Sequence, residues 1–429
     1  MKLTSSSSSS SENPTIDRLF DTAAELFWRQ GYAATTTREI AAAFGVQQAS
    51  LYHHIANKED LLYRICVSSL EPFVEQVPSE VAQVGRPSDR IRSLIHAHLT
   101  TLLRFQQRNV TQLTELRSLS ARHRTEVLAL RDKYEQFSRS ILKDAQAADA
   151  IRSDVPAKYL NLELMSILNH ASLWFRKGKA LTEDDLADIF TKVFLDGAAT
   201  PELRARLALP DLSARQSEGD KKPARARKTA TATDKPALTR ALDAAVGLFS
   251  RKGYTATSTR EVAKLLGIQK ATLYYHVESK EDLLFLICQS SLTQIRDDVE
   301  TAIREVPDPL ERLQTLICTH IESLLRDEAE HSTTFTEMHA LSEERFGQIM
   351  KLRDDYENMV RSVLREAQDA GVVRKDIEAK YLSLILLGIM NRVMIWYRRG
   401  GPLSPHQLGR LLGALFLGGA RPAGATSQP

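Results

Sequence analysis

Two segments of the chain, residues 36–54 and 258–276, carry polar side chains of the same types in nearly the same order. Each begins with hydroxyl residues, an arginine and a glutamate, and continues with a run rich in glutamine, hydroxyl residues, tyrosine and histidine. An arginine can bond O6 and N7 of guanine at once, while hydroxyl and lysine groups can bond phosphate oxygens. The residue types therefore suit contact with double-stranded DNA, although the same types also form the ordinary polar face of a short surface helix.

Local signals predict the elements that position these side chains. In the first segment, apolar residues at helical spacing over 16–27 precede Gly31, a residue type typical of the position just after a helix. Residues 36–39, Thr-Thr-Arg-Glu, have the spacing of a capping box and start a short second helix that ends at Gly45. We expect a third short helix over 47–55, which completes a helix-turn-helix. The second segment repeats each of these signals.

The chain carries two copies of one module. Gly31-Tyr32 recurs as Gly253-Tyr254 and Trp174 recurs as Trp396, in both cases 222 residues later. The offset is constant, so neither copy has an insertion or a deletion relative to the other. About 30 of the first 53 matched positions are identical, whereas the later parts of the copies agree only at scattered positions. Such a period indicates a duplicated two-part module, because solenoid repeats are only about 20 to 50 residues long.

Helical periodicity dominates both copies, and the sequence lacks alternating strand patterns bounded by hairpin turns, so we expect an all-α fold. The expected divisions are a disordered Ser-rich tail (1–14), a first helix-turn-helix domain (15–70), a first helical regulatory domain (71–199), a basic flexible linker (200–236), a second helix-turn-helix domain (237–292), a second helical regulatory domain (293–420) and a disordered tail (421–429).

The linker is rich in Ala, Pro, Thr, Lys and Arg. Its root-mean-square reach of roughly 30 to 35 Å would let the two copies lie side by side. The basic run at 221–228 could contact DNA phosphates, or it could be a solvated spacer.

Composition excludes several classes of protein. Lys and Arg number 57 against 54 Asp and Glu, so the net charge is only +3 and any basic surface must be local. The longest strongly apolar stretch, Leu382 to Met390, is about half as long as a membrane-spanning helix. Cys66, Cys288 and Cys318 are too few for a disulfide framework and are expected in the core. The start lacks the apolar core of a signal peptide, so we expect a cytoplasmic, nucleoid-associated protein.

These motifs resemble the tetracycline-repressor (TetR) family of bacterial one-component regulators. The matching series is Gly-Tyr (31–32), Thr-x-Arg-Glu-Ile-Ala (36–41), Gly-Val (45–46), Leu-Tyr-x-His (51–54) and Lys-Glu-Asp-Leu-Leu (58–62), and it recurs in the second copy. The resemblance covers about 55 residues of each copy strongly, and the following 130 or so match only as an all-helical ligand-binding and dimerisation domain. A family regulator has one such unit per chain and dimerises, whereas this chain has two.

The resemblance implies which residues contact DNA. They lie at the start of the second helix, on the third helix and at the start of the fourth helix of each copy. In the first copy they are Thr37, Arg38, Gln47, Gln48, Ser50, Tyr52, His53, His54 and Lys58. In the second copy they are Thr259, Arg260, Gln269, Lys270, Thr272, Tyr274, Tyr275, His276 and Lys280.

The recognition positions differ between the copies, while Arg38 and Arg260 agree. The differences are Gln48 against Lys270, Ser50 against Thr272, and His53 against Tyr275. We therefore expect the DNA site to be an imperfect inverted repeat, whose halves share the base bound by arginine and differ elsewhere.

After residues 70 and 292, apolar periodicity predicts a bundle of five or six long helices, with breaks at Pro78, Pro87, 147–150, Gly178 and their counterparts. The last two helices of each copy, 157–177 with 182–197 and 379–399 with 404–419, are rich in apolar residues. By resemblance they pair as the four-helix bundle of the family's dimer. The two copies can pair within one chain as a pseudo-dimer, which we favour, or chains can exchange partners as a homodimer.

Two short segments, Trp174 to Gly178 and Trp396 to Ser404, resemble an acyl-CoA-sensing branch of the family. Arg392 precedes Trp396 by one helical turn, so the two side chains could share a face that binds a phosphate or a thioester. The first copy has His170 in place of this arginine, which favours a pocket in the second copy alone. The candidate ligand-binding residues are thus Arg392, Trp396, His170 and Trp174. Alternatively, both tryptophans are core or interface aromatics and Arg392 is a solvated charge.

Four pairs of matched polar residues interrupt apolar patterns: His98 with His320, Glu115 with Glu337, Arg131 with Arg353, and Tyr134 with Tyr356. We expect most of them to form buried hydrogen bonds or surface pairs, and one or two to line a pocket.

The sequence thus predicts a ligand-responsive transcriptional regulator, a repressor whose two heads bind operator DNA until a small hydrophobic effector, with an acyl-CoA as the candidate, releases it. The effector would change the separation of the heads so that they no longer fit grooves about 34 Å apart. The alternative is an effector-independent architectural DNA-binding protein or activator. Motifs of hydrolases and nucleotide-binding enzymes and clusters of metal ligands are lacking, so we expect no enzyme activity, no cofactor and no metal.

Overall fold

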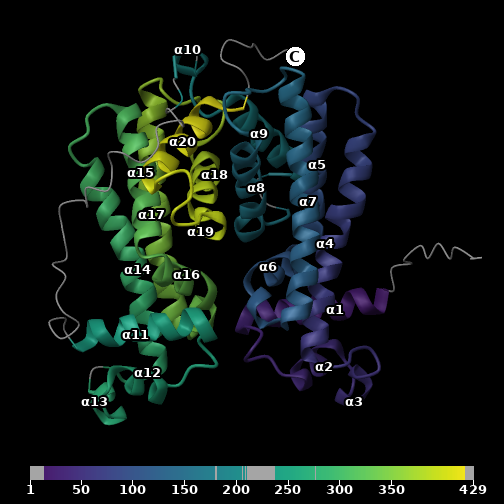
Figure 1. Ribbon diagram of the computed structural model, residues 1–429, viewed down its shortest axis with the longest axis vertical. Helices are drawn as coiled ribbons and strands as arrows, with labels where there is room; N and C mark the ends of the chain where they lie inside the picture. Colours follow the sequence, from purple (N-terminus) through teal and green to yellow (C-terminus); the bar gives the residue numbers. More distant parts are fainter. Residues whose placement is uncertain are drawn as a thin grey trace, which may run out of the picture.

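The computed structural model describes residues 14–178, 181–204, 206, 207, 209, 237–275 and 277–420. The secondary structure of these residues is helical, as the sequence predicted, apart from one isolated β-bridge between Ala199 and Val373. Figure 1 shows two columns of helices side by side, with the three short helices of each front domain at the same end of the molecule. The expected tails at 1–13 and 421–429 and the linker residues 210–236 lie outside the described residues.

The first unit contains the helices up to residue 204. They are α1 (Pro14–Gln30), α2 (Thr37–Phe44), α3 (Gln48–Leu51), α4 (Lys58–Ala82), α5 (Pro87–Arg104), α6 (Gln106–Thr114), the 3-10 helix η1 (Leu116–Ser118), α7 (Ala121–Ala147), α8 (Ala157–Trp174), α9 (Glu183–Asp196) and α10 (Pro201–Arg204).

The second unit repeats this order. Its helices are α11 (Ala237–Lys252), α12 (Thr259–Leu266), α13 (Lys270–Tyr274), α14 (Lys280–Ile303), α15 (Pro309–Arg326), α16 (Glu328–Glu337), the 3-10 helix η2 (Met338–Ala340), α17 (Glu343–Asp369), α18 (Ala379–Asn391), α19 (Val393–Trp396) and α20 (Pro405–Gly418). Matched helices such as α7 and α17 keep the 222-residue offset, so the two units are built alike.

The front domain of each unit, which we term its head, is the helix-turn-helix predicted from the sequence. Both capping boxes are present: Thr36 with Glu39 starts α2, and Ser258 with Glu261 starts α12. Gly45 ends α2 at a φ of 86°, a left-handed conformation that glycine adopts without strain. The third helix is shorter than the expected 47–55, because α3 covers only Gln48–Leu51 and the chain then turns toward α4.

One sequence expectation about a helix break was wrong. Pro78 does not end a helix: α4 runs through both Pro72 and Pro78, held by buried neighbours such as Phe73 and Val77 whose packing compensates for the missing amide bonds. At the domain boundaries expected after residues 70 and 292, α4 and α14 pass without interruption from each head into the bundle behind it. Each head is therefore joined to its bundle by a continuous rod.

The two units contact each other along a seam formed by α8, α9, α18 and α20, the four helices that the sequence expected to pair. Gly388 of α18 lies so close to α8 that a Cβ on it would be 2.8 Å from the His170 Cβ. At the end of the seam far from the heads, the backbone amide of Ala198 donates to Phe416 O at 2.8 Å, and the amide of Ala420 donates to Phe194 O at 2.8 Å. Equivalent residues of the two units thus form equivalent hydrogen bonds across the seam.

The chain stays ordered past the expected start of the linker at residue 200. The amide of Thr200 donates to Val372 O at 3.0 Å, and Pro201–Arg204 forms α10. The first unit therefore continues against the second unit for several residues beyond the sequence boundary.

One stretch, Ala379–Trp396, is long and apolar enough to cross a membrane by length and composition, and 67% of it is buried in protein. It spans α18 and α19 at the seam, where a soluble protein also places its most apolar helices. All three cysteines are buried, as the sequence predicted.

Candidate DNA interface and effector site

The outer surface of each head presents most of the polar residues that the sequence singled out. Arg38 and Arg260 are exposed in the first turns of α2 and α12. On the third helices and the turns that flank them, the exposed positions are Gln47, Gln48, Ser50, Tyr52 and His53 in the first unit and Gln269, Lys270, Thr272, Tyr274 and Tyr275 in the second. Tyr275 is 88% exposed, a large ring left in water.

A hydroxyl pair ties the second helix to the third in both heads. The hydroxyl groups of Thr37 and Tyr52 lie 3.2 Å apart, and those of Thr259 and Tyr274 lie at the same distance. In the first head, Gln48 Nε2 also donates to Thr37 Oγ1 at 3.0 Å. These bonds orient both hydroxyl residues in the absence of DNA, so part of the surface is preorganised.

The second head uses Lys270 where the first uses Gln48. The Lys270 ammonium lies 5.2 Å from the centre of the Tyr274 ring, a cation–π arrangement. The hydrogen bond from Thr259 and the charge of Lys270 together lower the pKa of Tyr274. The two heads therefore present different donors and charges at matched positions.

The two lysines expected to touch DNA are bound to their own heads. Lys58 Nζ donates to Tyr32 O at 2.9 Å and to Thr35 O at 2.7 Å. Lys280 Nζ does the same with Tyr254 O at 3.1 Å. Burial lowers the pKa of both lysines. Two of the three ammonium donors of Lys58 are thus used in fixing the turn between α1 and α2, so this lysine also positions the head.

The two histidines expected at the end of the third helix differ in position. His53 is exposed, whereas His54 is half-buried and its carbonyl oxygen accepts a hydrogen bond from Arg64. His276, the counterpart of His54, lies outside the described residues.

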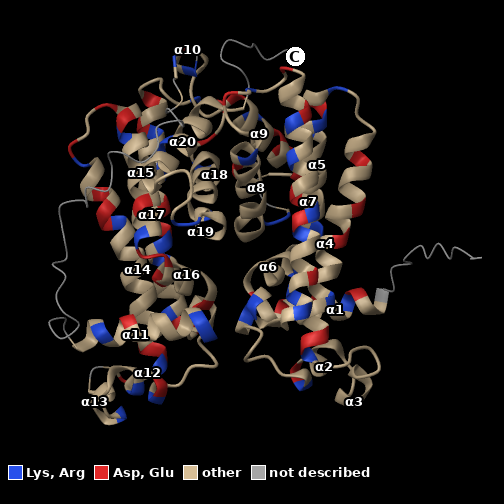
Figure 2. Ribbon diagram, viewed as in Figure 1, with Lys and Arg blue, Asp and Glu red and all other residues tan. Residues whose placement is uncertain are grey.

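Figure 2 shows Lys and Arg positions interspersed with Asp and Glu positions along the ribbons of both heads. This agrees with the small net charge of the chain, +3. Binding to DNA would then depend on a few placed contacts rather than on a broad positive surface.

The first head is clamped to its bundle by a residue that sequence reasoning missed. Arg108 on α6 is 2% exposed, and it bonds Asp17 Oδ1 at 2.8 Å and Asp21 Oδ1 at 2.6 Å, both on α1. The matched residue in the second unit is Glu330, so this clamp is not repeated. The sequence carried a signal for this difference, because the position 222 residues after Arg108 holds a glutamate, Glu330.

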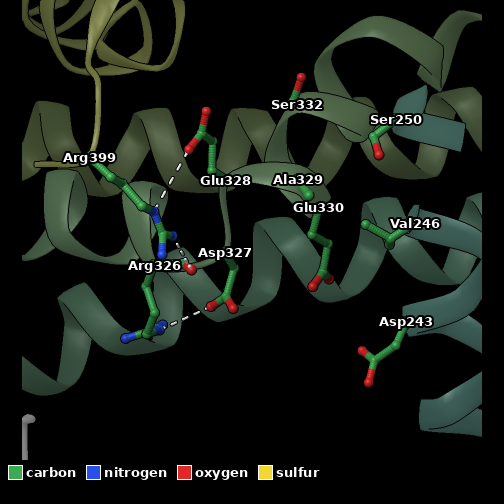
Figure 3. Close-up of a pocket in the computed structure, with 10 residues that line it drawn as sticks. All are labelled: Asp243, Val246, Ser250, Arg326, Asp327, Glu328, Ala329, Glu330, Ser332 and Arg399. Atoms are coloured by element: carbon green, nitrogen blue, oxygen red, sulfur yellow. Dashed lines mark hydrogen bonds and ion pairs between the residues drawn. The ribbon is translucent and has the colours of Figure 1, made fainter. Parts of the chain in front are cut away.

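In the second unit, a groove of about 530 Å³ lies between α11 and α16 at the place of the clamp. Its lining includes Asp243, Asp327, Glu328 and Glu330. Figure 3 shows Arg326 and Arg399 paired with the carboxylates of this wall, at 3.0 Å from Asp327 and 4.0 Å from Glu328. A wall with this excess of carboxylates does not suit an anionic ligand.

The matched polar residues of the bundles form buried pairs. His98 Nδ1 lies 2.8 Å from the Tyr134 hydroxyl, and His320 Nδ1 lies 2.6 Å from the Tyr356 hydroxyl. Burial lowers the pKa of both histidines to about 3, so both rings are neutral at pH 7. In the first unit, His98 Nε2 is buried without a hydrogen-bond partner.

Arg392 lies beside residues of the opposite unit. Burial, and then the charge of Arg131 in the first unit, lower the pKa of Arg392 to about 9. The charge of Arg392 in turn lowers the pKa of His98 further. His170, the residue matched to Arg392, is influenced by Arg353 of the second unit and has its pKa lowered to about 3, mainly by burial. Within the described part of the chain, the Arg392 guanidinium has no carboxylate partner.

The helix carrying Arg392 is not continuous, contrary to the sequence expectation of one helical face shared with Trp396. α18 ends at Asn391, and Arg392 forms a turn before the short α19. Trp396 and Trp174 both pack against the core of the bundles, as the alternative interpretation expected. The Trp396 indole nitrogen is nevertheless buried without a hydrogen-bond partner. The centre of the Trp174 ring lies 6.3 Å from that of Phe175 and 6.4 Å from that of Phe190.

Comparison with known families decides the assignment. The family described as "Bacterial regulatory proteins, tetR family" matches residues 19–65 and 241–287. The family described as "Tetracyclin repressor-like, C-terminal domain" matches residues 84–198 and 306–420. This chain belongs to the TetR family. It contains two complete TetR units in tandem, and each head and bundle above corresponds to one matched range.

Curated relatives resemble one TetR unit at a time. The HTH-type transcriptional repressor KstR2 of Mycobacterium tuberculosis is 28% identical over 179 residues, which is 42% of this chain and 90% of that protein. The fatty acid metabolism regulator protein of Bacillus subtilis is 22% identical over 160 residues, 37% of this chain and 82% of that protein. As a member of a family described as bacterial regulatory proteins, with relatives named as transcriptional regulators, the chain is a DNA-binding transcriptional regulator.

Solved TetR-family structures also match single units. PfmR of Thermus thermophilus is 32% identical, with a TM-score of 0.40, and covers 42% of this chain and 98% of its own. AibR, solved with isovaleryl coenzyme A and operator DNA, is 28% identical with a TM-score of 0.38, over 42% of this chain and 96% of its own.

Proposed function

We propose that this protein is a single-chain repressor that binds an imperfect inverted repeat with its two unlike heads and leaves the DNA when a small hydrophobic effector binds. One observation carries the proposal. Two heads with the same scaffold but different recognition residues belong to a single chain and lie at the same end of the folded molecule (Figure 1). Two such heads match the two halves of a two-part DNA site. Curated relatives named as repressors support the direction of regulation.

Pairing of the two units within one chain makes the protein a pseudo-dimer. The seam that joins them is made of backbone bonds such as Ala198 to Phe416 and of close helix contacts at Gly388. The proposal therefore expects one chain of 48.1 kDa on each operator, whereas an ordinary family regulator would require two chains. Light scattering of the protein–DNA complex measures this number directly, and two chains per operator would overturn the internal pairing.

The contribution of each head is tested by fluorescence anisotropy with the full chain and DNA from the region upstream of its own gene. Arg38→Ala and Arg260→Ala should each weaken specific binding by roughly 5- to 150-fold, since a good arginine–base contact is worth about 1 to 3 kcal/mol. Arg92→Ala, an exposed arginine on α5, removes the same charge away from both heads and should leave binding unchanged. If only one head variant lost binding, the two-headed proposal would be wrong.

For the effector, the strongest support lies around Arg392. Its guanidinium has lost much of its hydration without gaining a carboxylate partner among the described residues, and such a cation favours an anionic ligand group. The buried donors without partners on the same bundles include the Trp396 indole nitrogen and the Asn161 amide. A coenzyme A thioester combines phosphates with an acyl chain that would suit the apolar bundle, and a relative named for fatty acid metabolism supports this class.

The charge interactions of Arg392 with His98 and Arg131 support an effector site on the first unit's side of the seam, whereas its sequence position suggested the second copy. The test is release of DNA by butyryl-, octanoyl- and palmitoyl-CoA, with free coenzyme A and octanoate as controls. Arg392→Met should raise the acyl-CoA concentration needed for release while DNA affinity without ligand stays unchanged. Arg399→Met is the matched control, because this exposed arginine bonds only backbone oxygens of α15 and a carboxylate nearby.

An effector-independent architectural protein or activator is the second candidate. It would bind the same DNA with both heads, but no acyl-CoA would release it, and deletion of the gene would not raise transcription from the bound promoter.

A further inference from the structure

We infer that a second contact between the units, close to the heads, fixes the separation of the two heads and so selects the spacing between the two DNA half-sites. Its residues are Gly31, Arg117, Glu337 and His339, which we term the head joint. The inference rests on the proposed two-headed binding, but the geometry of the joint can be tested without DNA.

One side of the joint is an ion pair across the units. Arg117 of η1 in the first unit binds the carboxylate of Glu337 at the end of α16 in the second unit. Arg117 is 33% exposed and Glu337 is 5% exposed, so the bond is mostly shielded from water. The Arg117 guanidinium carbon also lies 3.8 Å from the position that a Cβ would take on Gly253, at the end of α11.

The other side of the joint is the equivalent contact with the two units exchanged, and it has a histidine in place of the arginine. His339 occupies the position matched to Arg117, and it lies against Gly31 at the end of α1. A Cβ on Gly31 would be 2.7 Å from His339 Nε2, closer than real Cβ contacts allow. The histidine ring thus packs directly on the backbone of the first head, and a methyl group at residue 31 would force the ring or the turn to shift.

Movement at the joint must reach the DNA-binding surface, because Gly31 begins the turn that leads to α2. Lys58 bonds Tyr32 O and Thr35 O in that turn, and Glu115 Oε1 accepts the Tyr32 amide at 3.3 Å. The head beyond the turn is one packed core that includes Ile40 and Leu51. A shift of Gly31 therefore carries α2 and α3 with it as a rigid body.

The joint and the backbone bonds at Ala198 and Ala420 hold the units together at two levels of the molecule. Two bodies held at two separated points keep one orientation and one separation. Heads held in this way bind half-sites of one spacing tightly and others weakly, whereas loosely linked heads accept several spacings. The joint would then act as a specificity-determining element without touching a base.

The matched variants Gly31→Ala and Gly253→Ala isolate the joint from ordinary backbone strain. The two glycines have φ values of 81° and 84°, so alanine is strained equally at both. Only the methyl group at residue 31 overlaps a side chain of the other unit, since the nearest atoms to a Cβ at 253 are 3.8 Å away. A difference between the two variants therefore reports the contact with His339.

The first measurement is the distance between spin labels on the heads of the full chain. Ala43→Cys and Leu265→Cys occupy matched, exposed positions on α2 and α12, and the three native cysteines are buried. Gly31→Ala should shift or broaden the distance distribution, Gly253→Ala should leave it as in the parent, and His339→Ala added to Gly31→Ala should restore it. Equal distributions for Gly31→Ala and Gly253→Ala would overturn the inference.

The second measurement is the half-site spacing recovered when each full-length variant selects DNA from a random library. The parent should recover one spacing, and Gly31→Ala should recover a different spacing or several. If the parent selected no two-part site, the proposed function would fail while the label distances still tested the joint. If Gly31→Ala changed the label distance but kept the parental spacing, the joint would not select spacing and the inference would be wrong.

Discussion

A Cβ built on Gly197 would lie 2.0 Å from the carbonyl oxygen of Leu417, across the seam between the two units. Gly197 also has a φ of 74°, so two independent constraints require glycine here. Gly419, matched to Gly197, is equally crowded, at 2.5 Å from the Gly197 amide nitrogen. The seam therefore depends on an approach of two backbones that no other residue permits.

The first prediction concerns this approach. Gly197→Ala should lower the free energy of unfolding by about 3 kcal/mol or more, because the overlap with a backbone oxygen adds to the strain of a φ of 74° with a ψ of 175°, a conformation essentially limited to glycine. Gly371→Ala is the control, since Gly371 has the same φ of 74° with nothing within 4 Å of its Cβ position. It should show the strain alone. Urea unfolding of both variants checks the difference, and equal losses would contradict it.

The second prediction concerns the unlike heads. Changing Gln48→Lys, Ser50→Thr and His53→Tyr together gives the first head the recognition residues of the second. If these side chains contact bases, the preferred operator should change from an imperfect to a nearly perfect inverted repeat. Anisotropy on paired asymmetric and symmetric duplexes measures the preference. A variant that still favoured the asymmetric duplex by the parental ratio would show that the differences lie off the interface.

The third prediction concerns Glu163, a carboxyl group buried on α8 with one oxygen lacking a hydrogen-bond partner. Burial raises its pKa from 4.5 to about 8. Between these values the folded protein holds a proton that the unfolded chain loses, so this group lowers the stability as pH rises from about 4.5 to 8. Glu163→Gln should therefore be more stable than the parent at pH 8 and similar to it near pH 4.5.

Thermal unfolding at the two pH values checks this prediction, with Glu80→Gln as the control because Glu80 is exposed. The second unit has Ile385 at the position matched to Glu163, which shows that an uncharged side chain fits this packing. A gain for Glu163→Gln that did not depend on pH would mean that the carboxyl is not protonated in the folded state.

The fourth prediction concerns the clamp of Arg108 on α1. Asp17→Asn with Asp21→Asn leaves the buried guanidinium without carboxylates and should destabilise the packing of α1 by about 1 to 3 kcal/mol, because the loss of a partner exposes the cost of burying a charge. Asp243→Asn makes the matched change in the second head, opposite Glu330 rather than an arginine. It should not loosen α11.

Hydrogen exchange of the α1 and α11 amides in the full chain measures both effects. Faster exchange in α1 alone is the expected result. Equal loosening of both helices would show that the arginine clamp gives the first head no special stability.

The sequence was sufficient for the elements whose signals are local. The capping boxes at Thr36 and Ser258, the turn at Gly45 and the 222-residue repeat predicted both helix-turn-helix heads, because caps and turns depend on side chains within a few residues. The proline rule failed at Pro78, where packing of neighbouring apolar residues outweighed a local preference.

The sequence predicted which helices pair across the two units, but the tertiary structure alone decided which side chains meet there. Lys58 looked like a DNA contact in the sequence, but its bonds to Tyr32 O and Thr35 O appear only once the fourth helix packs on the first turn. Arg392 looked like part of its own unit and lies near His98 and Arg131 of the other. Periodicity along a chain specifies which face of a helix is buried, but the partner of that face depends on long-range packing, which residue spacing does not encode.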